Sequence, residues 1–92
     1  MKIELKKSDL KMVDGGATIA VGKAFQYLNS AKSELEPNLY AEAKKSLNSF
    51  IATQFIVIPT GIFITMPILK GEIALVDSKE FARAIIARKT LN

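Results

Sequence analysis

The sequence predicts an α+β fold with two layers, and three local patterns carry this prediction. Residues 1–7 alternate, with Ile3 and Leu5 on one face and charged side chains on the other, which is the period of a half-buried strand. Residues 39–54 repeat apolar side chains at helical spacing. Residues 62–66 are rich in β-branched and aromatic side chains, which favour strands. A chain of 92 residues is expected to form one domain, 1–92.

The composition excludes several classes of site. The chain contains no cysteine, so disulfides and cysteine-ligated zinc are excluded, and no histidine, which is the usual general base and the commonest metal ligand. Hydrophobic residues make up 49% of this short chain, so apolar surface is left over and a homodimer is expected. The N-terminus, MKIELKK, has no apolar segment of the kind found in signal peptides. We therefore expect a cytoplasmic protein.

The charge balance is mildly basic, with a formal net charge of +4 and a pI of about 9.5. Such a balance is compatible with a nucleic-acid or anionic-membrane partner, and equally with no charged partner. The glycines at 15, 16 and 22 are not a phosphate-binding loop, because no Gly-Lys-Ser/Thr sequence follows them. We expect no enzymatic activity, no cofactor and no metal.

The stretch from Ser46 to Leu69 contains no charged residue, so it is either a membrane span or the core of a small domain. Pro59, Pro67 and Gln54 lie inside it, which is unusual for a span. It also begins partway through the amphipathic helix predicted at 39–54. We therefore expect the buried end of that helix and the start of a strand, joined by a turn at Pro59-Thr60-Gly61. A single span remains the alternative.

Weaker patterns fill the first half of the chain. Residues 8–16 are expected to form a loop that ends in Asp14-Gly15-Gly16. Residues 17–29 carry a helical stripe, and Asn38 is the expected N-cap of the helix at 39–54. Residues 34–36 are at most a very short strand, because Pro37 interrupts them.

The C-terminal part is ambiguous. The strand at 62–66 is expected to continue to Val76 with a bulge near Pro67 and Lys70-Gly71. Asp77 and Glu80 form a capping box that would start a helix at Ser78, although residues 77–80 also suit a hairpin turn. Residues 81–89 fit either period, and local propensity favours the helix.

A family resemblance runs through the middle of the chain. Ile51, Ala52, Phe55 and Val57, the Pro59-Thr60-Gly61 turn, Ile64 and Pro67 resemble the stretch between the second helix and third strand of the stage V sporulation protein S family. That family belongs to the Alba-like nucleic-acid-binding proteins. Gly71 and the basic segment 84–89 are similar to the Alba hairpin and last strand.

The resemblance implies the order strand–helix–strand–helix–strand–strand, in which the last two strands form a long C-terminal hairpin. Residues 77–80 would then be the hairpin tip, and residues 81–89 a strand. It also implies a non-enzymatic homodimer that binds DNA or RNA through phosphate contacts without reading sequence, in a chromatin-like or regulatory role.

The candidate site residues follow from the same resemblance. Alba-like proteins place lysines against phosphates in the loop after the first strand, and glycine N–H groups at a helix N-terminus bind phosphates well. The expected nucleic-acid-binding residues are Lys6, Lys7, Lys11, Gly15, Gly16, Arg83 and Arg88. The alternatives are a solvated strand end for the lysines and protection of a sheet edge for the arginines.

Other functions stay open. Phe63, Met66, Phe81 and Tyr40 are possible stacking platforms for bases, although core or dimer packing explains them more simply. A structural or assembly subunit of a phage particle or other complex is the alternative function, because the hydrophobic content is high and the region 70–80 is slightly acidic.

Overall fold

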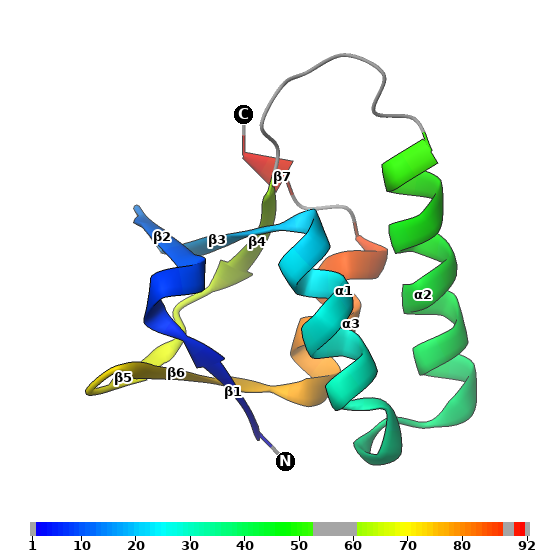
Figure 1. Ribbon diagram of the computed structural model, residues 1–92, viewed down its shortest axis with the longest axis horizontal. Helices are drawn as coiled ribbons and strands as arrows, with labels where there is room; N and C mark the ends of the chain where they lie inside the picture. Colours follow the sequence, from blue (N-terminus) through cyan, green and yellow to red (C-terminus); the bar gives the residue numbers. More distant parts are fainter. Residues whose placement is uncertain (1, 53–60, 88–89, 92) are drawn as a thin grey trace.

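The computed structural model describes residues 2–52, 61–87 and 90–91, with the backbone alone at 50–52 and 90–91 (Figure 1). Its strands are β1 (Lys2–Lys6), β2 (Leu10–Val13), β3 (Gly16–Ala20), β4 (Gly61–Thr65), β5 (Ile68–Lys70), β6 (Ile73–Asp77) and β7 (Thr90–Leu91). Its helices are α1 (Val21–Ser30), α2 (Pro37–Ala52) and α3 (Ser78–Ile86), with short 3₁₀ helices η1 (Lys7–Asp9) and η2 (Lys32–Glu34). The α+β class is confirmed.

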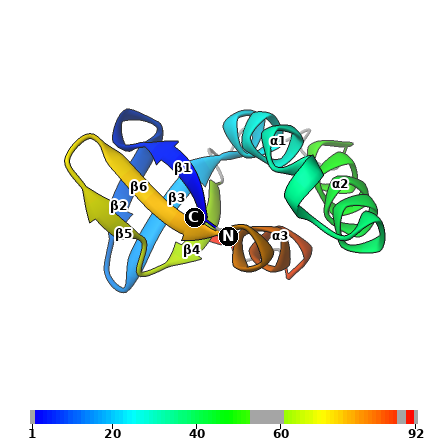
Figure 2. The same ribbon diagram turned by 90° about the horizontal axis from the view of Figure 1, so that it is seen from below.

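The described strands form two antiparallel sheets, ordered β1-β6-β5 and β2-β3-β4-β7. The sheets lie on one side of the molecule and the helices on the other (Figure 2). The chain crosses between the sheets at η1 and again at Met66-Pro67, where Met66 adopts a φ of 38°. Helices α1 and α3 contact strands, whereas α2 packs mainly across α1 and α3. Both sheets therefore share one core beneath the helices.

The core is built from the inner faces of both sheets. Leu5 is paired with Ala74 in one sheet, and Ile19 with Ile62 in the other, and all four are at most 1% exposed. The helices complete the core with their apolar faces: Val21, Ala24, Leu28, Ala43, Leu47, Phe81, Ala82 and Ile85. The half-buried alternation predicted for residues 1–7 is confirmed in β1.

Helix α3 overturns the prediction of a strand at 81–89, of which residues 81–87 are described. The Asp77 carboxylate accepts hydrogen bonds from the N–H groups of Lys79 (2.9 Å) and Glu80 (3.2 Å), so it is the N-cap. The N–H of Glu80, followed by that of Lys79, holds the pKa of Asp77 below its usual value. The local capping signal was right, and the hairpin tip at 77–80 inferred from the family resemblance is wrong.

The N-terminal half also differs from prediction. Residues 10–13 of the expected loop form β2, and residues 16–20 form β3, so the helix begins at Val21. Residues 34–36 form no strand: η2 ends at Glu34 and α2 begins at Pro37, which leaves only two residues between them. The observed order therefore differs from strand–helix–strand–helix–strand–strand. Neither sheet carries the long C-terminal hairpin within the described residues.

The charge-free stretch divides much as expected where it is described. Strand β4 confirms the strand at 62–66, but the bulge is wrong: the chain turns a corner at Met66-Pro67 and makes a hairpin turn at Gly71-Glu72. Helix α2 begins at Pro37, so Asn38 lies in its first turn and not at the cap. The Pro59-Thr60 turn lies outside the described residues.

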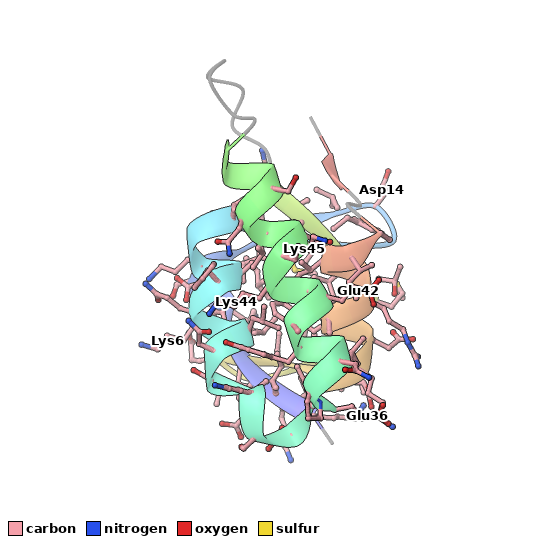
Figure 3. All side chains as sticks on the ribbon, turned by 90° about the vertical axis from the view of Figure 1, so that its right-hand side faces the viewer. Lys6, Asp14, Glu36, Glu42, Lys44 and Lys45 are labelled. Carbon is pink, nitrogen blue, oxygen red and sulfur yellow. The ribbon has the colours of Figure 1, made fainter. Side chains whose placement is uncertain are left out.

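Helix α2 is amphipathic. Ala43 and Leu47 are fully buried, while Glu42, Lys44 and Lys45 are exposed around the rest of the helix (Figure 3). Among the described residues, no helix is both long and apolar enough to cross a membrane.

Candidate nucleic-acid interface

The predicted lysine cluster is divided between the two sheets. Lys6 ends β1, and its partner Ile73 lies with it on the outer face of the three-stranded sheet. Lys7 begins η1, where its N–H donates to the carbonyl of Glu72 at 3.0 Å. Lys11 lies in β2, in the other sheet. All three side chains are exposed, but the structure does not bring them together.

A polar network occupies the corner next to Lys6 and Lys7. The Lys6 N–H donates to the Tyr27 hydroxyl at 3.0 Å, and that hydroxyl donates to the Asp9 carboxylate at 2.7 Å. Burial raises the pKa of Tyr27, and the carboxylate of Asp9 adds to the effect. Lys23 Nζ lies 3.9 Å from Asp9 Oδ1. This network ties α1 to η1, and its carboxylate reduces the attraction of the corner for phosphate.

Gly15 and Gly16 form no helix N-terminus, so their predicted role there is wrong. Gly15 lies in the β2–β3 turn with a φ of 83°, which suits glycine, and its carbonyl accepts from the Met66 N–H at 3.0 Å. Gly16 is buried, and a Cβ there would lie 2.0 Å from the Ile64 carbonyl oxygen. Gly15 therefore serves the turn and Gly16 the close approach of β3 to β4, while α1 begins only at Val21.

Lys11 belongs to a row that crosses three strands. It lies opposite Thr18 in β3, and Thr18 lies opposite Phe63 in β4. Residues directly opposite each other share a face, and neighbouring strands are about 4.8 Å apart, so the backbones of Lys11 and Phe63 are separated by about 10 Å. The flanking residues Ile19 and Ile62 are buried, so the row points away from the core.

A shallow depression of about 240 Å³ lies between β4 and α3, next to this row. Its lining residues are Phe63, Ile64, Thr65, Glu80, Arg83, Ala84 and Ala87. Small-molecule sites usually occupy about 300–1,000 Å³, so the depression is a surface feature and not an enclosed pocket. Arg83 is exposed, and its guanidinium has no hydrogen bond or ion pair to any residue that the structure describes. We call Lys11, Thr18, Phe63 and Arg83 the Phe63 face.

Two of the predicted cations are thus each related to Phe63, one through the cross-strand row and one through the depression. Lys11 and Arg83 flank Phe63, and Lys11 also lacks an ion pair within the described part of the chain. Glu80 lines the same depression and opposes an anion there. Arg88 lies outside the described residues, although it directly follows Ala87 in the chain. Thr18 was not predicted, because its position on the face depends on the unpredicted strand β3.

The other stacking candidates have different surroundings. Phe81 is fully buried in the core. Tyr40 donates to Asn29 Oδ1 at 2.7 Å and lies below Lys32, whose Nζ is 5.3 Å from the ring centre. Met66 is 74% exposed at the corner between the sheets. Of the four, Phe63 alone lies in a row with a cation from another strand.

A second surface is apolar. Met66, Ile68, Leu69 and Ile73 are 74%, 53%, 45% and 37% exposed, although each is a large hydrophobic side chain. We call these four residues the β5–β6 patch. Strand β5 lies at the edge of the three-stranded sheet as described. Ile68 and Ile73 lie on the outer face of the sheet, whereas Leu69 lies on the face of Ala74, so the patch wraps around the edge strand β5. Exposed apolar side chains gathered at a sheet edge often mark an interaction site.

The described residues contain no cluster of acidic side chains able to hold a metal ion. Comparisons with protein-family models, curated proteins and solved structures gave no match to the chain.

Proposed function

We propose that this protein is a small, non-enzymatic nucleic-acid-binding protein that contacts the phosphate backbone through the Phe63 face and reads no sequence. The single observation that carries the proposal is the position of Lys11 and Arg83 on either side of Phe63. Neither cation is neutralised by an ion pair within the described residues. Both charges are therefore available to phosphates.

The expected binding is weak and depends on salt. Each phosphate that a cation neutralises releases counterions, so the affinity falls as salt rises. A face with two cations and one carboxylate, Glu80, fits the range of non-specific binding, with a dissociation constant of about 10⁻⁴–10⁻⁶ M. Phosphate contacts carry no sequence information, so sequence readout is not part of the proposal.

The resemblance to Alba-like proteins implies the same ligand class and a chromatin-like or regulatory role. The observed order of strands and helices, however, differs from the order that the resemblance implies. Only part of the expected site therefore lies on the Phe63 face. Lys6 and Lys7 belong to the other sheet, beside Asp9, and Gly15 and Gly16 shape the sheet. Arg88 stays a candidate contact.

Binding of a labelled oligonucleotide at about 50 mM salt tests the proposal. We expect binding at micromolar protein concentration, and a weaker complex for Lys11→Gln and for Arg83→Gln. Lys44→Gln is the matched control, because Lys44 is exposed on α2 and its removal lowers the net charge equally. The absence of binding to both DNA and RNA at this salt concentration would disprove the proposed function.

The β5–β6 patch favours a second candidate, an assembly subunit that associates through this surface as a homodimer or larger complex. Its four side chains are 37–74% exposed, and an edge strand offers unpaired backbone groups to a neighbouring chain. Light scattering after size-exclusion chromatography tests this candidate: Ile68→Glu is expected to return an oligomer to the monomer. A wild-type protein that stays monomeric at high concentration would rule it out.

A further inference from the structure

The Phe63 ring lies against the sheet and borders open space. A Cβ on Gly16 would lie 3.0 Å from Phe63 Cζ, so the ring reaches across the sheet to the bare backbone of Gly16. Phe63 is half-buried, and the depression beside it opens to solvent. The cross-strand neighbour Thr18 has a small side chain. The ring is therefore held in place from one side while part of its surface stays accessible.

An aromatic ring held in this way is a platform for an unpaired base. Bases of every kind present a π-face, so stacking on an aromatic side chain is tolerant of sequence. A single strand of nucleic acid that crosses β2, β3 and β4 at the Phe63 face passes Lys11 before the ring and Arg83 after it. This arrangement combines one stacking site with a cation on each side, as single-strand binders do.

The projecting parts of the molecule argue against a duplex. Asp14 occupies the β2–β3 turn and Glu72 the β5–β6 turn, so each hairpin tip carries a carboxylate. A groove lined by phosphates repels such tips. Arg83, an exposed cation of α3, is accompanied by Glu80 in the same depression. Bases inside a duplex are stacked on each other and leave no face for Phe63.

We propose that the ligand of the Phe63 face is single-stranded nucleic acid, with one base stacked on the Phe63 ring and the flanking phosphates bound by Lys11 and Arg83. This inference rests on the proposed function and names its ligand class. It assigns to Phe63 the largest share of the preference for single strands.

Fluorescence anisotropy of labelled oligo-dT, oligo-U and a duplex, each of about 12 nucleotides per strand, tests the inference at low salt. Phe63→Leu is expected to weaken binding to the single strands at least about fivefold and to leave duplex binding unchanged, because stacking contributes to single-strand binding alone. Phe63→Tyr keeps an aromatic ring and is expected to stay within about twofold of the wild type. Phe25→Leu, on α1, controls for the loss of an aromatic ring elsewhere.

The outcomes separate this inference from the proposed function. Equal affinity for duplex and single strand, unchanged by Phe63→Leu, overturns the single-strand assignment and leaves phosphate binding intact. A lack of binding to all three probes overturns both. A difference in affinity between oligo-dT and oligo-U shows whether the single strand is DNA or RNA, and either result supports the assignment to single strands. Crosslinking of 5-iodouracil to Phe63 supports the stacked base, whereas crosslinks confined to residues off the Phe63 face contradict it.

Discussion

The salt dependence of binding gives a quantitative prediction for the Phe63 face. Two cations, Lys11 and Arg83, flank Phe63 in the described structure. For single strands, the slope of log affinity against log salt is about −0.7 for each neutralised phosphate, which gives a slope of about −1.4 for two. Between about 50 and 200 mM salt, a fourfold change, the affinity should fall about sevenfold. With Lys11→Gln or Arg83→Gln, the slope should be about −0.7, and the fall only about 2.6-fold.

Anisotropy titrations with oligo-dT at four or more salt concentrations measure these slopes. Lys44→Gln should keep the wild-type slope, because Lys44 is exposed on α2, the helix that lies away from the sheets in Figure 2. The reasoning is refuted if the Lys44 variant changes the slope as much as the Lys11 variant. That result would mean that net charge, and not the Phe63 face, governs binding.

Two glycine substitutions should have opposite effects on the free energy of unfolding, measured with urea. Gly16→Ala places a Cβ 2.0 Å from the Ile64 carbonyl oxygen and should destabilise the fold by about 1–3 kcal/mol. Gly22→Ala meets open space in a helix and should stabilise it by about 0.5–1 kcal/mol. Equal effects of the two substitutions would contradict this prediction. The pKa of Asp77 is lower in the folded state than its usual value of 3.8, so its ionised carboxylate stabilises the fold above pH 3.8. This stabilisation is lost as the pH falls through the folded-state pKa and the carboxylate is protonated. Asp77→Ala should therefore flatten this acid dependence in circular dichroism, and an unchanged pH profile would argue against the cap.

Elements with a strong local signal were predictable. The helical stripe of α2 and the β-branched run of β4 depend on short-range periodicity, and both were found where expected. The start of α3 is equally local, since Asp77 caps it, whereas the family resemblance predicts a strand at this place. Local capping geometry involves a few adjacent residues, whereas a distant resemblance carries assumptions about the whole chain.

The β2–β3 hairpin, which was not predicted, has no strong local signal in the sequence. Ala17 fits the helical register of Val21 and Ala24 as well as it fits a strand, so the sequence suggested a longer helix. Its strand conformation depends on pairing with Ile64, far along the chain. This pairing is a tertiary contact that overrides local propensity, and no local pattern reveals it.

The same long-range pairing determined which site predictions came together. Lys11 and Arg83 were both candidates, but their arrangement around Phe63 requires β3 to lie between β2 and β4. Lys6 and Lys11 are near each other in sequence, yet η1 carries the chain from one sheet to the other between them. Spacing along the chain therefore could not distinguish the lysine that shares a face with Arg83 from those that do not.

The most direct test of the binding face is a map of amide chemical shifts during titration of the ¹⁵N-labelled protein with oligo-dT. We predict that the largest changes cluster at Lys11, Thr18, Phe63 and Arg83, with little change at Lys44 on α2. Changes centred on the corner of Lys6 and Lys7, or on the β5–β6 patch with none at Phe63, would contradict binding at the Phe63 face.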